Sequence, residues 1–249
     1  MESKISEILE ICRNKLPESD GFEFYPFLIS WYNEVVPKQF QLDYDPSTLA
    51  VLTLSTPCMF EETFKPWILS SYKKENIKDL LTRDPIDQCI VAKSQSLTQA
   101  LKDKQVEVEA IHDFEILPNR RPKIIMTSCG HVSGAAYYYK PQNGDKPMAA
   151  GEKFLGLSVH PKYGGWFAFR TVFIFPRIQA SDLPRKYPSD VMGDSAKTSE
   201  ILEEFNYRWR DWNYRDCIPD IAERYSHEQK LYFGTEPGKR YPIIESWLN

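Results

Sequence analysis

Apolar residues recur at intervals of three or four positions in several segments of this chain, a spacing typical of helices. In the first of these segments the pattern runs up to Pro17, which cannot continue a helix. Asp84 and Pro85 suit an N-cap and a first helical position, so a helix is expected to begin there. The predicted helices cover residues 3–16, 61–72, 84–102 and 199–215, and a last helix starts near Ser226.

Other segments alternate between two faces, a spacing typical of strands. Residues 166–175 (WFAFRTVFIF) are apolar on both faces apart from Arg170 and Thr171, which predicts a central strand. Further strands are predicted at residues 49–55, 105–113, 123–128 and 154–160. The Gly-, Pro- and Asp-rich residues 142–152 predict a surface loop, and residues 176–198 a long connection. Together these elements predict one α+β domain over residues 1–249, built around a mostly antiparallel sheet.

Composition and charge argue against several classes of protein. Hydrophobic residues form 42% of the chain and charged residues 27%, which is typical of a globular protein. A net charge of −4 does not favour binding to nucleic acid or to an anionic membrane. No segment approaches the ~18 apolar residues of a membrane span. Glu2, Glu7 and Glu10 interrupt the basic N-terminus, so neither a secretory signal nor a mitochondrial presequence is expected.

The cysteines predict a reducing environment. They are five in number, widely spaced and without a CxxC pair, so neither a disulfide framework nor a zinc site is expected. A cytoplasmic location fits this pattern best. The five are Cys12, Cys58, Cys89, Cys129 and Cys217.

The run Gly130–Tyr139 (GHVSGAAYYY) places one of only four histidines among small residues, directly before three tyrosines. Small residues would let a large flat ligand approach the backbone, and tyrosines offer broad rings with polar ends. A metal-binding role for His131 would need partners, but His112 and His160 are distant in sequence and show no metal-ligand spacing. We therefore expect His131 to form hydrogen bonds, and we predict no metal ligands in the chain.

Arginines form a second group of candidates. Arg170 stands in the middle of an aromatic strand, where it must either pair with an acid or face a cavity that takes a carboxylate or phosphate. The helix predicted at residues 199–215 would place Arg208, Trp212 and Arg215 on one face, where cation–π stacking could serve stability or binding. No GxGxxG, P-loop or GxSxG motif supports a Rossmann, nucleotide-hydrolase or esterase function.

Eight segments, in the same order along the chain, resemble the MMACHC (cobalamin C protein) family over about residues 21–240. They are FEFYPFLISWYNEVVP, LSTPCMF, DPIDQC, PNRRPKI, HVSGAAYYY, HPKYGGWFAFR, FNYRWRDWNYRD and ERYSHEQKLYF. The resemblance implies a nitroreductase or flavin-reductase-like fold, with a mostly antiparallel sheet flanked by helices and cobalamin in the place of flavin. It also implies two activities on base-off cobalamin, as cyanocobalamin reductase and as alkylcobalamin dealkylase.

The resemblance further implies the co-substrates and partners. Decyanation would take electrons from FAD or FMN and ultimately NADPH, and dealkylation would use glutathione as alkyl acceptor. A flavoprotein reductase and a downstream MMADHC-like trafficking protein would be partners, and the chain would be a monomer or weak homodimer. The basic loop at residues 118–122 (PNRRP) would contribute to such a dimer. A non-catalytic cobalamin chaperone and a flavin-dependent nitroreductase without corrin are the alternatives.

The family's site residues are carried over by position. The glutathione site falls on Arg170, Arg215, Arg240 and Trp212. His131 falls beside the displaced dimethylbenzimidazole tail and is not expected to bind cobalt. The other cobalamin contacts fall on Asp113, on a strand containing Ile124, Ile125, Met126 and Thr127, and on Tyr138, Tyr139, Lys140, Ser158 and Phe169.

Five residues in or near this pocket differ from those typical of vertebrate members. Lys140 replaces a glutamine, Ser158 a cysteine, Phe169 an isoleucine, Thr127 a glutamine and Cys129 an alanine. A pocket altered in this way could let reduced cobalamin meet oxygen. A side activity as a glutathione (thiol) oxidase is therefore a further hypothesis.

Overall fold

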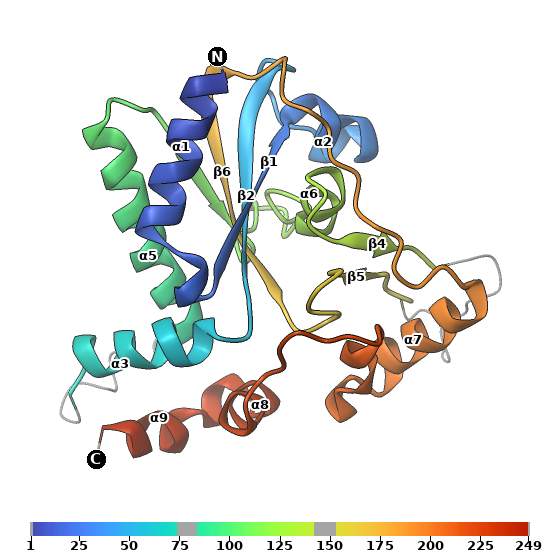
Figure 1. Ribbon diagram of the computed structural model, residues 1–249. Coiled ribbons are helices and arrows are strands. Elements are labelled where there is room, and N and C mark those ends of the chain that lie inside the picture. The colour runs from blue at the N-terminus through green and yellow to red at the C-terminus, as the bar shows by residue number, and fades with distance from the viewer. Residues whose placement is uncertain (1, 74–83, 142–152, 249) are drawn as a thin grey trace.

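A four-stranded antiparallel sheet forms the centre of the molecule (Figure 1). The computed structural model describes residues 2–73, 84–141 and 153–248, so the loop predicted at residues 142–152 lies outside the described part. The strand order is β1-β2-β6-β3, with every neighbouring pair antiparallel. The strands are β1 (Phe22–Leu28), β2 (Thr48–Ser55), β6 (Ala168–Gln179) and β3 (Glu109–His112). The central position predicted for residues 166–175 is confirmed, because β6 lies between β2 and β3.

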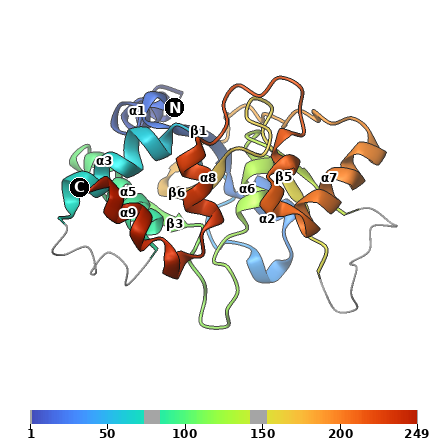
Figure 2. The ribbon, with the colours of Figure 1, turned by 90° about the horizontal axis from the view of Figure 1, so that it is seen from below.

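Helices cover both faces of this sheet (Figures 1 and 2). One face carries α1 (Glu2–Lys15) and α5 (Pro85–Asp103), which contact each other. The other face carries α2 (Ile29–Val35) and α6 (Met126–Val132), which also contact each other. The Asp84 side chain accepts a hydrogen bond of 3.0 Å from the Ile86 amide, so the predicted N-cap of α5 is confirmed.

Further elements lie at one end and to one side of the sheet (Figure 1). At the end lie α3 (Lys65–Ser71), which continues a π-helical turn at Phe60–Phe64, and the helices α8 (His227–Gly234) and α9 (Tyr241–Trp247). To the side lie a second antiparallel sheet of β4 (Tyr137–Tyr139) and β5 (Leu157–Val159), and the helix α7 (Ser195–Tyr207).

Tertiary contacts overrule two of the sequence predictions. The strand predicted at residues 123–128 is wrong, because helix α6 begins at Met126. The Tyr32 hydroxyl accepts the Ile125 amide hydrogen at 3.0 Å, a bond that stands where a strand partner would be. The single helix predicted at residues 199–215 is also wrong. It ends at Tyr207, and Trp212 adopts a left-handed φ of 65° between two 3₁₀ turns, Trp209–Asp211 and Asn213–Asp216.

Three strand boundaries also differ from prediction. Strand β3 occupies only Glu109–His112 of the predicted 105–113, and β5 only Leu157–Val159 of 154–160. Strand β6 continues through Pro176 to Gln179, into the predicted connection. β1 and α2 were not predicted, because residues 22–36 are apolar without a clear period.

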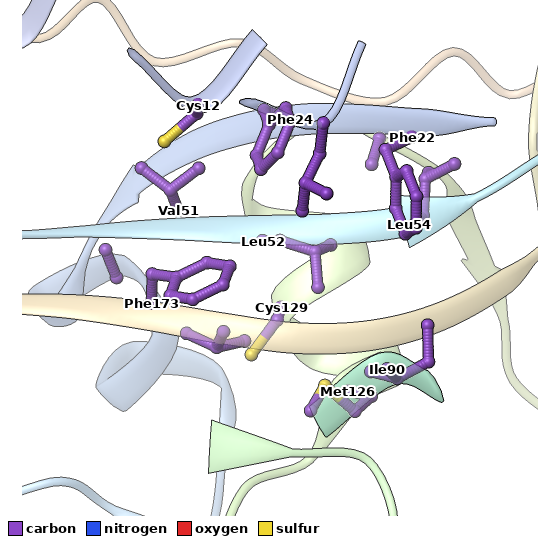
Figure 3. Close-up of a cluster of buried hydrophobic side chains, with 14 of the residues drawn as sticks. Cys12, Phe22, Phe24, Val51, Leu52, Leu54, Ile90, Met126, Cys129 and Phe173 are labelled. Carbon is purple, nitrogen blue, oxygen red and sulfur yellow. The ribbon is translucent and has the colours of Figure 1, made fainter. Parts of the chain in front are cut away.

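Both faces of the sheet are packed with apolar side chains (Figure 3). Cys12 of α1, Phe24 of β1, Val51 of β2 and Phe173 of β6 are all buried in this core. All eight residues of β2 are buried, as expected for an inner strand covered by helices on both sides.

A buried polar cluster joins β1 to the connection between β5 and β6. The Glu23 carboxylate accepts hydrogen bonds from Tyr25 at 2.5 Å and from Tyr163 at 2.7 Å. His160 Nε2 lies 2.9 Å from the Tyr25 hydroxyl, while its Nδ1 accepts the Lys162 amide hydrogen at 3.1 Å. We call Glu23, Tyr25, His160 and Tyr163 the Glu23 cluster. Each of its four side chains is bonded to another member.

Candidate functional site

One cavity of about 360 Å³ gathers six of the predicted cobalamin contacts. It lies where the chain enters α6 and where β6 begins, so residues far apart in sequence share its wall. The lining residues include Asp113, Ile124, Ile125, Met126, Thr127 and Phe169, together with Pro122 and Ala168. Most of this wall is apolar, as a flat macrocycle would require. Although the predicted strand is a loop and a helix start, the structure places its four residues together.

A second cavity of about 460 Å³ gathers four more of the predicted contacts. His131 at the end of α6, the tyrosines of β4 and Lys140 form one side, and the segment leading into α7 forms the other. The Tyr139 hydroxyl donates to Asp190 at 2.7 Å and accepts the Met192 amide hydrogen at 3.0 Å. Tyr139 therefore holds the segment before α7 against β4.

His131 has one nitrogen committed to the protein. Its Nδ1 accepts the Tyr138 amide hydrogen at 3.2 Å, so the predicted hydrogen-bonding role is confirmed. Removal from water lowers the pKa of His131, and the nearby Lys140 and Arg185 lower it further. The imidazole is therefore neutral at pH 7 and carries its proton on Nε2, the nitrogen left for a ligand.

Ser158 is in β5, paired in register with Tyr138, which lines the second cavity. Its side chain is buried, and its hydroxyl has no hydrogen-bond partner among the described residues. A buried hydroxyl without a partner costs about 1–3 kcal/mol. An acceptor or donor supplied by a ligand would remove that cost.

The small residues of Gly130–Tyr139 do not form an open wall, contrary to the expectation from sequence. Ala135 and Ala136 are fully buried. Gly130 is buried against the Phe169 ring, which occupies the space that a side chain at position 130 would need. The small residues thus allow Phe169 to pack on α6, and Phe169 in turn lines the first cavity.

Arg170 is the extra residue of a β-bulge. Thr53 of β2 pairs with Thr171, and the next residue, Leu54, pairs with Phe169, so Arg170 has no partner in this ladder. A bulge re-aims a side chain and interrupts strict alternation. The buried Arg170 uses only Nε within the protein, as a donor to the Ser55 hydroxyl at 2.8 Å. Its two terminal nitrogens have no acceptor among the described residues.

Arg240 lies near Arg170 in space but is paired. Its guanidinium forms an ion pair of 2.9 Å with Asp84 and donates through Nε to the Thr235 carbonyl at 3.0 Å. The side chain is only 9% exposed and stacks over the Tyr232 ring at 4.6 Å. Pairing with an acid was one of the two roles expected for Arg170, and the structure shows it for Arg240 instead.

Arg215 sits in an aromatic cage. Its guanidinium lies 5.0–5.6 Å from the ring centres of four aromatic residues: Trp166, Trp212, Tyr214 and Tyr225. One terminal nitrogen donates to the Gly165 carbonyl, whereas Nε is buried and has no partner in the described part of the chain. Arg208 lies outside this cage in an exposed pair with Glu204, so its predicted grouping with Trp212 and Arg215 is wrong.

Aromatic rings connect Arg215 to Arg240. Tyr225, part of the cage, lies 5.6 Å from Phe233, and the Arg240 guanidinium lies 5.9 Å from that same ring. The predicted Trp212 stacks parallel to Trp166 with ring centres 6.0 Å apart. The structure therefore brings the predicted arginines and Trp212 into one region at the end of the main sheet.

Sequence reasoning did not place acidic residues in this region: Asp113 was predicted only as a cobalamin contact, Asp84 only as a helix N-cap, and Asp87 was not predicted. Arg170 and Arg240 are close enough to Asp87 to influence its pKa. The carboxylates of Asp84 and Asp113 also influence the pKa of Asp87. The Asp113 amide also donates to the Arg170 carbonyl at 3.0 Å, which links this region to the first cavity. We call Asp84, Asp87, Asp113, Arg170 and Arg240 the arginine–aspartate cluster. Only the acidic segment DPID of the sequence hinted at it.

Two carboxyl groups of this cluster, those of Asp87 and Asp113, have raised pKa values. Burial, helped by Asp84 and Asp113, raises the pKa of Asp87 to about 6. Burial also raises the pKa of Asp113, although the Arg170 guanidinium opposes that rise. Perturbed carboxyl groups beside a cavity are typical of functional sites.

The protein's own thiols are not activated. Burial raises the pKa of every cysteine, to about 12 for Cys12 and Cys89 and to about 11 for Cys217. Cys58 and Cys129 shift in the same direction for the same reason. A thiol is a nucleophile only as thiolate, so any thiol chemistry at this site requires a thiol from outside.

The described residues contain neither a cluster of metal ligands nor a membrane-spanning helix. Within residues 2–73, 84–141 and 153–248, no three His, Cys, Asp or Glu side chains are grouped as a metal site would require. Over the same ranges no helix combines the length and the apolar character needed to cross a membrane.

The fold and the site define an α+β protein with one cavity at the start of α6, a second at its end, and an arginine-rich region at the end of the main sheet. Comparison with known proteins gives the family. A model of the methylmalonic aciduria and homocystinuria type C family, MMACHC, matches residues 21–244, and this chain belongs to that family.

Related proteins align with nearly the whole chain. Proteins of mouse and human named cyanocobalamin reductase / alkylcobalamin dealkylase are each 41% identical over 98% of this chain, which covers 84% and 83% of them. The crystal structure of a B12-trafficking protein CblC of Caenorhabditis elegans, described as a human MMACHC homologue, superposes with a TM-score of 0.92. It is 35% identical, over 100% of this chain and 98% of that one.

Proposed function

We propose that this protein binds cobalamin base-off and removes its upper axial ligand, by reductive decyanation of cyanocobalamin and by glutathione-dependent dealkylation of alkylcobalamins. The observation that carries the dealkylase activity is Arg170, a buried guanidinium whose terminal nitrogens have no acceptor among the described residues. Such a fork suits a ligand carboxylate. The names of the mouse and human relatives support both activities.

The cobalamin substrate is assigned to the two cavities. The corrin lies against the apolar first cavity, with Phe169 and the start of α6 as its wall. The displaced nucleotide tail enters the second cavity beside His131, whose Nε2–H offers a hydrogen bond. The Ser158 hydroxyl, which has no partner among the described residues and belongs to the strand paired with Tyr138, is available to the same substrate.

Dealkylation takes glutathione at Arg170, Arg215 and Arg240, with Trp212 as part of the cage. The two carboxylates of glutathione bind guanidinium groups, and the nearby positive charge favours the thiolate form of glutathione. The thiolate sulfur attacks the alkyl carbon, and the cobalt–carbon bond breaks with both electrons left on cobalt. The products are a thioether and cob(I)alamin, and the thiol proton passes to solvent. Since no cysteine of the chain is activated, an external thiol is the nucleophile that the site requires.

Decyanation requires an electron donor, which we propose to be reduced FAD or FMN supplied with NADPH. The apolar wall around Phe169 would fit a flat isoalloxazine ring as it fits a corrin. Reduction of cobalt weakens its bond to cyanide, which leaves as the anion. The residues' part is to hold the cobalamin with its base displaced and to exclude water from its face.

The remaining features of the proposal come from the family resemblance. We propose a single domain with a nitroreductase-like fold, a cytoplasmic location, and a monomer or weak homodimer. Partners are a flavoprotein reductase and an MMADHC-like trafficking protein. A glutathione oxidase side activity follows if oxygen reoxidises the reduced cobalamin, so that two thiols form a disulfide and oxygen becomes hydrogen peroxide. Equal consumption of glutathione with and without oxygen would exclude that activity.

The proposal is tested by mixing the protein with methylcobalamin and glutathione without oxygen and recording the absorption spectrum. Loss of the methylcobalamin bands, with S-methylglutathione detected by mass spectrometry, is the expected result. A non-catalytic carrier would shift the band as the base leaves cobalt but would produce no thioether. A flavin-dependent nitroreductase would retain FMN and leave cobalamin unbound.

A further inference from the structure

Asp87 is a carboxylate without a partner in a region full of charge. Among the described residues it forms no hydrogen bond or ion pair, unlike Asp84 three residues earlier, which caps α5 and pairs with Arg240. It is half-buried and lines a cavity of about 380 Å³ with Trp67, Val91, Ala92 and Phe114 among its neighbours. Apolar walls of this kind disfavour a charged group.

The charged neighbours of Asp87 come from several elements. Asp84 precedes α5, Asp113 follows β3, Arg170 is on β6 and Arg240 precedes α9. The buried Tyr232 of α8 is close enough to Asp84, Arg240 and Asp87 for each of them to influence its pKa. Three carboxylates therefore share two guanidinium groups. With Asp84 and Asp113 ionised, the arginine–aspartate cluster carries one net negative charge when Asp87 is ionised and none when Asp87 is protonated.

The start of helix α5 does not account for this arrangement. Asp87 is in the first turn of α5, where the helix dipole favours a negative charge and would lower the pKa of a carboxyl group. Instead, burial and the two neighbouring carboxylates raise the pKa of Asp87 to about 6. The surroundings thus oppose the ionised form more strongly than the helix start supports it.

We infer that Asp87 couples anion binding at Arg170 and Arg240 to the uptake of a proton, so that the site accepts the dicarboxylate thiol most tightly when Asp87 is neutral. The inference deepens the proposed function and rests on glutathione as the ligand. A bound carboxylate adds negative charge beside Asp87, which raises the pKa of Asp87 further and draws a proton from solvent. Asp87 is a positioning residue here: it sets the charge of the site and does not touch the reacting atoms.

The expected consequence is a pH-dependent affinity. Below about pH 6 Asp87 is neutral in the free protein, and an anionic ligand meets no net repulsion from the cluster. As pH rises above that value, binding must be accompanied by protonation of Asp87, so the KM for glutathione increases. The kcat for dealkylation does not follow this profile, because Asp87 does not touch the reacting atoms in this scheme.

Isothermal titration calorimetry with S-methylglutathione measures the coupling directly, since this probe cannot be consumed. Titrations at pH 7 in phosphate and in Tris give different heats when protons are exchanged with the buffer. We expect uptake of roughly half a proton or more per ligand. The same measurement on Asp87→Asn should give none, with affinity at pH 7.5 raised about fivefold, a change on the scale of one partly screened charge.

Matched variants separate this role from a structural one. Asp87→Glu keeps the carboxyl group and should restore proton uptake. Asp103→Asn, at the exposed C-terminal end of the same helix, should behave as the wild type. In steady-state dealkylation the effect of Asp87→Asn should fall on KM for glutathione, with a flattened pH profile of KM, rather than on kcat.

Four outcomes would overturn the inference. Binding of S-methylglutathione by the wild type without proton uptake would refute the coupling and leave the proposed function intact. Unchanged proton uptake in Asp87→Asn would assign it to another group. A large loss of kcat in Asp87→Asn would show that Asp87 takes the thiol proton itself. Failure of the wild type to bind either glutathione or S-methylglutathione would overturn the proposed glutathione site and this inference with it.

Discussion

Two clusters of buried charge in this molecule are built on opposite principles. In the Glu23 cluster every member is bonded to another member, and Glu23 alone accepts from two tyrosines. In the arginine–aspartate cluster only the pair of Asp84 and Arg240 is closed within the cluster. Asp87 has no partner among the described residues, and Arg170 uses one nitrogen of three.

The carboxyl pKa values show what this difference means. Hydrogen bonds from His160, Tyr25 and Tyr163 lower the pKa of Glu23 to about 2 in spite of its burial. Burial without such bonds raises the pKa of Asp87 to about 6. The folded protein thus stabilises the charge on Glu23 and opposes the charge on Asp87. The first cluster therefore stabilises its own charge within the fold, whereas the second leaves charge unpaired, as the proposed ligand site requires.

The largest expected effect is the loss of stability in Glu23→Gln. The amide nitrogen of glutamine cannot accept a hydrogen bond, so one buried tyrosine hydroxyl loses its acceptor and the cluster loses its charge. We expect a loss of about 3 kcal/mol and a melting temperature lower by about 9 °C. Urea unfolding and calorimetry measure both. Glu107→Gln, which breaks an exposed pair with Arg177, should change stability by less than about 0.5 kcal/mol.

The same carboxyl group predicts how stability depends on acid. Because the pKa of Glu23 is depressed from 4.5 to about 2, its contribution is present above pH 4.5 and is lost as pH falls from there towards 2. The shift corresponds to about 3 kcal/mol. Unfolding free energies measured between pH 2 and 6 should therefore converge for the wild type and Glu23→Gln at the acid end. Parallel curves would contradict the bonding described for Glu23.

Arg170→Gln should leave the free energy of unfolding nearly unchanged and strongly reduce glutathione-dependent dealkylation. We expect kcat/KM for glutathione to fall about 100-fold, or about 2.7 kcal/mol, because a charged bidentate contact is lost. Cobalamin affinity, followed by the base-off spectrum, should change little. Arg177→Gln is the control, since Arg177 lies on the same strand with an exposed side chain. A parallel loss of cobalamin binding would mean that Arg170 supports the fold.

Asp87→Asn should have the opposite sign to Glu23→Gln. Since the folded-state pKa of Asp87 is raised, its ionisation lowers stability as pH rises from about 4 to about 6. Removing the charge should stabilise the protein at pH 7 by about 1 kcal/mol, an estimate reduced for partial exposure. Chemical denaturation at pH 7 and pH 4 tests the sign. If the variant is less stable at pH 7, Asp87 serves the fold and the contrast between the two clusters fails.

The smallest expected effect concerns Ser158. Its hydroxyl is buried without a partner, so Ser158→Ala should leave the ligand-free protein as stable as the wild type or more stable by up to about 1 kcal/mol. Cobalamin affinity should fall a few-fold. Ser94, equally buried, shares a hydrogen bond with Thr171, and Ser94→Ala should destabilise the protein by about 1 kcal/mol.

The elements predicted correctly are those whose periodicity is long and whose ends are marked. Helix α5 has five buried apolar residues at helical spacing and an Asp–Pro start. Strand β6 has an unbroken aromatic and β-branched run. By contrast, the short apolar run at Ile124–Thr127 has a strand-like composition, and only Tyr32 from α2 shows why it is not a strand. Three or four residues contain too little pattern to decide against tertiary contacts.

The site was predicted for a different reason and to a different depth. Positions carried over from the family resemblance do meet in two cavities and one arginine-rich region. Periodicity alone indicated only that Arg170 was unusual. The Asp84–Arg240 pair joins residues 156 positions apart, and no local pattern predicts such a contact. The position of Asp87 beside these arginines could not be predicted for the same reason.

The bulge at Arg170 means that this residue could be lost by deletion with little change to the pairing of β2 and β6. The ladder between β2 and β6 pairs Thr53 with Thr171 and Leu54 with Phe169, so it already passes over position 170. Deleting that one residue would leave both strands in their existing register and would preserve Phe169 against α6. The shortened chain would keep Phe169 in the first cavity, and would lose the free guanidinium and the acceptor of the Asp113 amide. Under the proposed function, a single codon thus separates a chain that has the dealkylation site from one that retains only the cobalamin cavities.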